Sequence, residues 1–265
     1  MNIQINRITL GYEDRGTGLP LVFLHAFPLS RRMWDSQLLY LSRRFRVVTI
    51  DLRGHGESDA PLWRYRLEES ADDVNGLLDH LAIDRAVLIG LSMGGYLAFA
   101  FYRQYATRVK GLVLADTRAG ADSAEGREGR FQMAQTAYKK GASAIAELML
   151  PKLLVPATLA EKPEIVRQVR SIIEANEISG IAGDLMAMAE RPDSSAMLPT
   201  ISCPTLIIVG EEDVATPPAE SRFMADKIPG ARLAVILAAG HLSNVEQPDV
   251  FNRLVEEFAA GLPIE

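Results

Sequence analysis

Short apolar segments recur along the chain and alternate with stretches of helical periodicity. They are rich in β-branched side chains and lie at residues 21–25, 46–50, 86–90, 109–115, 205–209 and 232–237, after a further predicted strand at 3–12. Continuously apolar runs of this kind are typical of strands that are buried on both faces of a parallel sheet. Their alternation with helices predicts an α/β fold with a doubly wound, mostly parallel sheet.

Four of the intervening stretches have the signals of helices. They lie at residues 68–82, 93–105, 217–228 and 248–260. Acidic residues at the start of the first favour a helix N-terminus, and prolines at the start of the last two suit a first helical turn.

The alternation stops between residues 117 and 200, where the sequence contains no convincing strand. This stretch predicts about four helices, at roughly 123–140, 142–150, 158–175 and 178–190, separated by Gly141, Pro151, Pro156, Pro163 and Pro192. We therefore expect residues 1–116 and 201–265 to form an α/β core and residues 117–200 to form a helical cap subdomain.

Methionine is concentrated in the predicted cap, which holds five of the nine methionines of the chain, Met133, Met149, Met186, Met188 and Met197. Methionine fills irregular gaps in a core, and it also lines adaptable apolar pockets. The two interpretations are compatible. Met149, Met186 and Met188 are the candidates for a substrate pocket.

The net charge of −6 and the pI of about 5.4 argue against a nucleic-acid binder, which needs a cationic surface. No apolar run approaches the length needed to span a bilayer, so membrane insertion is not expected. The first residues lack the apolar core of a signal peptide, which favours a cytoplasmic location. Self-association into a homo-oligomer is left open.

The strongest local motif is Gly90-Leu91-Ser92-Met93-Gly94, which lies between a predicted strand and a predicted helix. A serine in such a tight turn has a strained backbone, and only small residues two positions away avoid colliding with it. The turn directs the hydroxyl out of the fold, beside the free N–H groups of the helix N-terminus. Ser92 is therefore the candidate nucleophile.

A serine hydroxyl needs a base, and the chain offers only four histidines. His241 is the best candidate because it follows the last predicted strand, where the carboxyl ends of strands gather. His25 and His55 are expected to make structural hydrogen bonds near the site. His80 is interpreted as a residue at the C-terminus of a helix.

The base in turn needs a carboxylate that orients it. Asp213 follows the predicted strand at 205–209 and is the first candidate. Glu211 and Glu212 are neighbouring rivals, and Asp116, which ends another strand, is the runner-up. With Asp213 the order along the chain is serine, acid, histidine, which differs from the orders of the chymotrypsin and subtilisin groups.

Motifs for other chemistries are missing from the sequence. The single cysteine, Cys203, rules out an internal disulfide or a paired-cysteine metal site. The histidines lack the spacing of a zinc peptidase, and no nucleotide-binding glycine motif is present. The sequence therefore predicts neither a metal nor a cofactor.

These motifs together resemble the α/β-hydrolase superfamily over nearly the whole chain, and most closely small carboxylesterases, 3-oxoadipate enol-lactonases and cofactor-free haloperoxidase-type perhydrolases. The resemblance includes His25-Ala26-Phe27-Pro28, the segment 51–58, the turn at Ser92, and the loops ending at Asp213 and His241. It implies an α/β-hydrolase fold and an oxyanion hole formed by the backbone N–H groups of Phe27 and Met93. Ala26 stands where that pattern usually has glycine.

The predicted function is a serine hydrolase that acts on a small ester or lactone, with Ser92, His241 and Asp213 as catalytic triad. Cleavage of a carbon–carbon bond or an amide, or perhydrolysis, would use the same triad and remains an alternative. A hydrolase-like receptor with slow turnover is a further alternative, because fold alone does not determine function.

Overall fold

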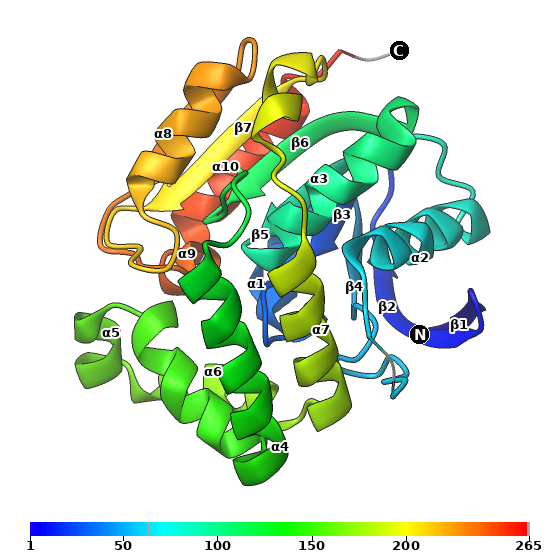
Figure 1. Ribbon diagram of the computed structural model, residues 1–265. Coiled ribbons are helices and arrows are strands. Elements are labelled where there is room, and N and C mark those ends of the chain that lie inside the picture. Colours follow the sequence, from blue (N-terminus) through cyan, green and yellow to red (C-terminus); the bar gives the residue numbers. More distant parts are fainter. Residues whose placement is uncertain (63, 264–265) are drawn as a thin grey trace.

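The computed structural model of the protein describes residues 1–62 and 64–263 and contains an eight-stranded sheet in the order β1-β2-β4-β3-β5-β6-β7-β8 (Figure 1). The strands are β1 (Asn2–Ile5), β2 (Ile8–Arg15), β3 (Pro20–Leu24), β4 (Arg46–Ile50), β5 (Ala86–Leu91), β6 (Val109–Ala115), β7 (Thr205–Gly210) and β8 (Arg232–Ile236). Strands β3 to β8 pair in parallel, whereas β2 pairs with β1 and β4 in antiparallel fashion. The predicted mostly parallel α/β sheet is confirmed.

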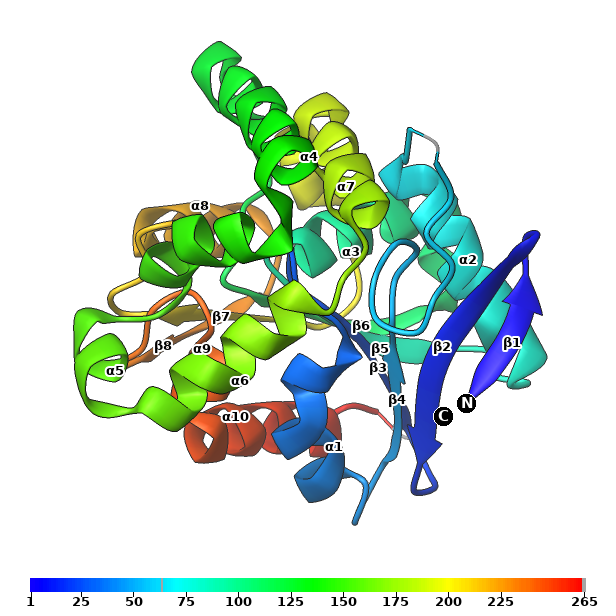
Figure 2. The same cartoon turned by 90° about the horizontal axis from the view of Figure 1, so that it is seen from below.

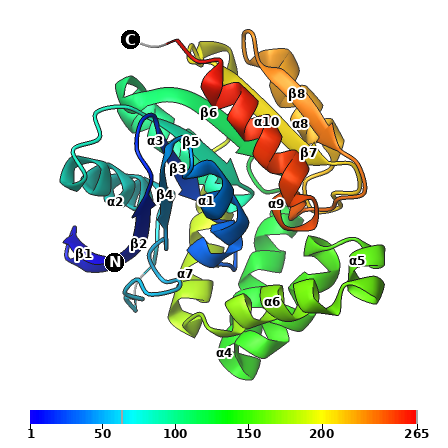
Figure 3. The same ribbon diagram turned by 180° about the vertical axis from the view of Figure 1, so that it is seen from behind.

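Helices cover both faces of the sheet (Figure 2). One face carries α1 (Asp35–Leu41) and α10 (Pro248–Ala260), which lie side by side (Figure 3). The other face carries α2 (Leu67–His80), α3 (Met93–Tyr105) and α8 (Pro218–Lys227). The short helix α1 was not predicted, and a 3₁₀ turn (Arg31–Trp34) leads into it.

The N-terminal segment differs from the prediction of one strand at residues 3–12. Asn6 and Arg7 have φ values of 48° and 69°, so the chain reverses there and forms a β-hairpin of β1 and β2. Left-handed backbone is uncommon outside glycine, and arginine is not a residue that signals it. The alternation of apolar residues therefore continues through a turn that the pattern alone did not reveal.

Residues 116–204, all of which the structure describes, contain helices and no strand. The main helices are α4 (Ala124–Leu153), α5 (Pro156–Glu161), α6 (Pro163–Glu174) and α7 (Ile178–Glu190), and they lie together beyond one end of the sheet (Figure 1). We refer to residues 117–200 as the cap.

Two boundaries in the cap differ from the prediction. The predicted helix at 158–175 is divided into α5 and α6, because Pro163 occupies the first turn of a new helix. The break predicted at Pro151 is wrong. Proline removes one N–H donor, yet Leu154 N still donates to Leu150 O at 3.1 Å, and α4 continues to Leu153. At Gly141, φ is 80° and the helix is kinked as predicted.

The core is densest around the central strands, whose side chains are enclosed on both sides. Every residue of β5 and β7 is buried. Between the sheet and the helices α1 and α10, Trp34 packs against Phe23 and Phe251 with ring centroids 5.0 and 5.8 Å apart. This packed layer supports the strand ends from which the loops of the candidate site emerge.

The turn between β5 and α3 depends on glycines that allow close backbone contact. Ser92 has φ 55° and ψ −112°, a conformation that costs an L-residue of order 1–3 kcal/mol. A Cβ atom on Gly94 would lie 2.1 Å from Leu24 O, and one on Gly90 would lie 2.2 Å from Gly94 O. The backbone of α3 therefore presses directly on the end of β3.

We expect Gly94→Ala to lower the free energy of unfolding by about 3 kcal/mol or more, because the collision is with backbone that cannot move aside. Gly129→Ala is the matched control. A Cβ atom there meets nothing within 4 Å, and alanine in a helix interior should raise the stability by up to about 1 kcal/mol. Urea unfolding measures both variants. Equal stability of Gly94→Ala and the parent protein would contradict this account of the turn.

Candidate active site

The three residues expected to form the triad lie beyond the carboxyl ends of three parallel strands in the same half of the sheet. Ser92 directly follows β5, Asp213 lies in the loop after β7, and His241 lies in the loop after β8. Because parallel strands place their carboxyl ends at one edge of the sheet, loops far apart in the sequence meet there.

The side chains form a continuous chain of hydrogen bonds. His241 Nε2 is 2.8 Å from Ser92 Oγ, and His241 Nδ1 is 2.9 Å from Asp213 Oδ2. Asp213 is held in turn by N–H groups of Ala215 and Thr216, at 2.8 and 3.0 Å, and by the Thr216 hydroxyl at 2.7 Å. The carboxylate is thus fixed from three sides and can orient the imidazole.

Burial and charge act on the two ionisable groups in opposite directions. Burial lowers the pKa of His241, but the charge of Asp213 and the hydrogen bond to it prevail and raise it above the usual 6.5. Burial raises the pKa of Asp213, and here the charge of His241 and hydrogen bonds from His241 and Thr216 prevail and lower it. Asp213 is therefore the ionised partner, and it favours a protonated imidazole.

The other candidate acids, Asp116, Glu211 and Glu212, form no hydrogen bond to His241 among the described residues. Asp116 accepts hydrogen bonds from Gly210 N at 2.7 Å and from Ser243 Oγ at 2.5 Å, so it bridges the loops that carry Asp213 and His241. Burial, together with the charge of Asp213, raises the pKa of Asp116 to about 8. Glu211 and Glu212 are exposed at the surface of their loop. Of these four acids, Asp213 is the one hydrogen-bonded to His241.

The other three histidines form no hydrogen bond with Ser92 or Asp213 among the described residues, and each has a structural position. His25 Nε2 accepts from Leu52 N at 3.0 Å, and its Nδ1 therefore donates to Ala26 O at 3.1 Å. His55 is buried beside Asp184 of the cap, with Nδ1 3.4 Å from the carboxylate. His80 ends helix α2.

The expected oxyanion donors lie on either side of Ser92. Met93 is the first residue of α3, and Phe27 lies in the turn after β3. Within residues 1–62 and 64–263, neither backbone N–H donates to a protein acceptor. Ala26 has no positive φ, so alanine is accommodated there without backbone strain.

A pocket of about 430 Å³ opens beside Ser92 and His241. Met149 and Met188, two of the three predicted pocket residues, line it together with Phe27, Tyr96 and Met133. It also contains basic side chains that the sequence analysis missed, namely Arg118, Arg130 and Lys152. No motif distinguishes these three, because they line one pocket only once the cap has folded over the sheet.

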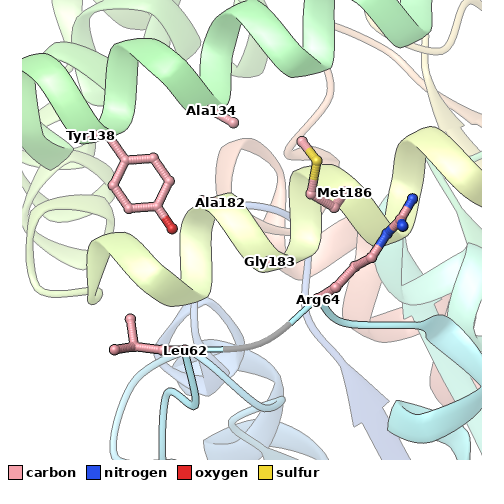
Figure 4. A pocket seen from close by; sticks show the side chains of 7 residues that line it. All are labelled: Leu62, Arg64, Ala134, Tyr138, Ala182, Gly183 and Met186. Atoms are coloured by element: carbon pink, nitrogen blue, oxygen red, sulfur yellow. The ribbon is translucent and has the colours of Figure 1, made fainter.

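Met186, the third predicted residue, lies in a separate pocket of about 490 Å³ (Figure 4). Residues of α4 and α7 line this second pocket together with Leu62 and Arg64, and its described lining contains none of the three triad residues. Tyr138 and Leu62 lie toward one end of it, and Met186 and Arg64 lie toward the other. Met186 and the triad therefore do not share a pocket.

Two buried side chains connect the cap to the loops of the site. Asn176, between α6 and α7, donates to Pro28 O at 2.8 Å and accepts from Gly56 N at 2.8 Å. Glu246, in the short helix α9 (Ser243–Glu246), accepts from Val155 N at 2.9 Å and from Gly240 N at 2.6 Å. The cap is thus bonded both to the turn of Phe27 and to the loop of His241.

Among the described residues, no group of three or more histidine, cysteine or acidic side chains is arranged to hold a metal ion. No helix in the described part of the chain has both the length and the apolar composition needed to cross a membrane.

We expect Asp213→Asn to lower the pKa of His241, because the ionised partner that favours the imidazolium is removed. Titration of the imidazole by NMR measures this pKa. Asp226→Asn, at an exposed position of α8, is the control and should leave it unchanged. An unchanged value in Asp213→Asn would show that this carboxylate does not govern the histidine.

Comparison with known proteins agrees with this architecture. A family model described as alpha/beta hydrolase fold matches residues 20–248. 3-Oxoadipate enol-lactonase 2 of Acinetobacter baylyi is 32% identical over 255 residues, covering 96% of this chain and 92% of that protein. The solved structure of a thermophilic esterase from Thermogutta terrifontis has a TM-score of 0.95 at 43% identity and covers 98% of this chain and 97% of its own. That of the enol-lactonase from Burkholderia xenovorans LB400 has a TM-score of 0.92 at 32% identity, with 98% and 100% covered. The resemblance noted in the sequence is confirmed, and the chain belongs to the alpha/beta-hydrolase family.

Proposed function

We propose that the protein is a serine hydrolase that cleaves a small carboxylic ester or lactone through an acyl-enzyme intermediate. The observation that carries this proposal is the unbroken chain of hydrogen bonds from Asp213 through His241 to Ser92. It ends at a pocket of about 430 Å³, a volume that suits a small molecule.

The first half of the reaction forms the acyl-enzyme. Ser92 Oγ attacks the ester carbonyl carbon while His241 Nε2 accepts the hydroxyl proton. Asp213 keeps the proton on Nδ1 and stabilises the imidazolium that forms. The carbonyl oxygen becomes an oxyanion, which accepts hydrogen bonds from the N–H groups of Phe27 and Met93. The carbon–oxygen bond then breaks, and His241 passes its proton to the departing alcohol oxygen.

The second half uses water as the nucleophile. Water attacks the acyl carbon, His241 accepts its proton, and the acid is released as Ser92 recovers the proton. With a lactone, the alcohol stays attached to the acyl group, so the ring opens to a hydroxy acid; an enol lactone gives an enol, which tautomerises to the keto acid. These steps need only groups of the chain and water.

The relatives support ester bonds as the target. The similar proteins include an esterase and two enol-lactonases, all of which hydrolyse carboxylic esters, cyclic ones in the case of lactones. Each similarity extends over nearly the entire chain, the cap included. The cap supplies Met133, Met149 and Met188 to the pocket, and we propose that it selects the substrate and excludes bulk water.

We expect Ser92→Ala to keep the fold and to reduce kcat on short p-nitrophenyl esters by at least about 10⁴-fold, because the nucleophile is lost. Ser171→Ala, an exposed serine of α6, is the control and should retain full turnover. The same proteins are treated with a fluorophosphonate probe, which should label the parent and Ser171→Ala but not Ser92→Ala. Labelling of Ser92 without multiple turnovers would favour a slow receptor and contradict the proposed enzyme.

The pH dependence follows from the raised pKa of His241. Only the neutral imidazole accepts a proton, so kcat/KM is full at alkaline pH and is lost as pH falls through this pKa. We therefore expect the midpoint of the acid limb, measured with a neutral ester, to lie above 6.5. A profile that is flat from about pH 5 to 8 would rule out His241 as the base.

A further inference from the structure

The pocket beside Ser92 is positively charged in a chain that carries a net charge of −6. Arg118, Arg130 and Lys152 line it, and among residues 1–62 and 64–263 no aspartate or glutamate does. The rest of the lining is mainly apolar, with three methionines among them. A pocket that only received a neutral acyl chain would have no use for three cationic side chains at its wall.

Two of the basic residues belong to a larger cluster around one buried carboxylate. The side chain of Asp122 is 1% exposed and pairs with Arg118 at 2.5 Å, with Arg130 at 2.7 Å and with Arg191 at 2.9 Å. Although burial raises the pKa of Asp122, the hydrogen bonds and charges of Arg130 and Arg191 prevail and lower it to about 2. Asp122 is therefore ionised, and it neutralises only one of three guanidinium charges.

The three guanidinium groups differ in how much of their hydrogen-bonding capacity is already used. Arg191 donates to Met188 O and Gly120 O, both at 2.8 Å, and lies over the ring of Tyr96. It is held within the protein. Arg130, by contrast, uses Nε on Asp122, and within the described part of the chain neither of its Nη atoms has a protein partner. Its side chain keeps 21% exposure, at the pocket.

Arg118 and Lys152 complete this charged wall. Arg118 binds Asp122 through one Nη, and its side chain is 28% exposed, with the charge of Glu220 also acting on it. Lys152 lies near the end of α4, is exposed, and forms no ion pair with any described residue. The two arginines are held by Asp122 in a fixed position, which reduces the entropy lost when they bind an anion.

We propose that the substrate of this site is an anionic ester or lactone, whose free carboxylate binds Arg130, Arg118 and Lys152 while its ester carbonyl lies at Ser92. This inference rests on the proposed function and names the substrate class within it. Arginine suits a carboxylate because its planar N–H groups match the two oxygens. The apolar side chains between the cations and Ser92 then contact the carbon chain that joins the two ends of the substrate.

The first test compares two substrates of the same shape. Monomethyl glutarate carries a carboxylate, and its neutral counterpart has a primary amide in place of that carboxylate. We expect kcat/KM, followed by pH-stat titration, to favour the anionic ester by at least about tenfold, and the preference to shrink as salt is added. Equal rates on both esters in the parent protein would overturn the proposal.

Substitutions of the basic residues test which side chains cause the preference for the anionic ester. Arg130→Gln should reduce the ratio of the two kcat/KM values by about tenfold, and the exposed Lys152→Gln by about threefold. Arg127→Gln is the matched control, since Arg127 lies on the same helix but is exposed and does not line the pocket. Lys152→Gln removes no ion pair seen in the described residues, so it should fold like the parent protein. A reduced ratio in this variant therefore reports on substrate binding and not on misfolding. If Arg130→Gln and Lys152→Gln both keep the parental ratio, the cations do not bind the substrate.

Binding to Ser92→Ala separates this proposal from the proposed function. Calorimetry with the two glutarate esters requires no turnover, and we expect tighter binding of the anionic one, with Arg130→Gln in the same background removing the difference. If Ser92→Ala still cleaves esters, the proposed mechanism fails while the binding result still stands. If neither ester is preferred in binding, the anion site fails while the esterase mechanism stands.

Discussion

The backbone conformation of Ser92 is the constraint on which the rest of the site depends. Its φ of 55° is held by neighbours on all sides: Ser92 N donates to Ala115 O at 2.9 Å, and Ser92 O accepts from Thr117 Oγ1 at 2.7 Å and from Gly95 N at 2.9 Å. This turn is possible only because α3 lies directly against β3, where Gly94 contacts the backbone of Leu24. The strained residue therefore places both the hydroxyl and the start of the helix at the same point.

The second requirement is that the loops of Asp213 and His241 are correctly placed relative to this hydroxyl. A buried carboxylate, that of Asp116, connects them. Asp116 directly follows β6 and is bonded to the end of β7 through Gly210 and to the loop of His241 through Ser243. An acidic side chain is costly to bury, and here the cost is offset by hydrogen bonds and by a raised pKa. Asp116 thus acts on the relative position of Asp213 and His241, without contacting the hydroxyl of Ser92.

Much of this arrangement could be predicted from the sequence, because its signals are local. The apolar runs identify the strands, the glycines around Ser92 identify the turn, and strand ends in a parallel sheet bring Asp213 and His241 to one edge. Features that depend on tertiary contacts could not be read in this way. The turn at Asn6 and Arg7 has only a weak sequence signal, because Asn6 favours left-handed backbone but Arg7 does not. The basic residues of the pocket come together only through the position of the cap. Met186 and Met188 are two positions apart on α7, so they point to opposite sides of the helix and line different pockets.

The bonds between the cap and the core have a consequence for how a molecule enters. Leu242 N, beside His241, donates to Leu153 O of the cap at 3.0 Å, and Glu246 and Asn176 add buried bonds at two further points. A cap that lifted as one rigid flap would pull on the loop of the histidine and on the turn of Phe27 together. Substrate entry and catalysis would then need two different states of the protein, one with the cap lifted and one with it closed. A substrate can instead enter through the mouth of the pocket when single flexible side chains, such as those of methionine and lysine, move aside. The hydrogen bonds from Asp213 through His241 to Ser92 then stay intact between turnovers.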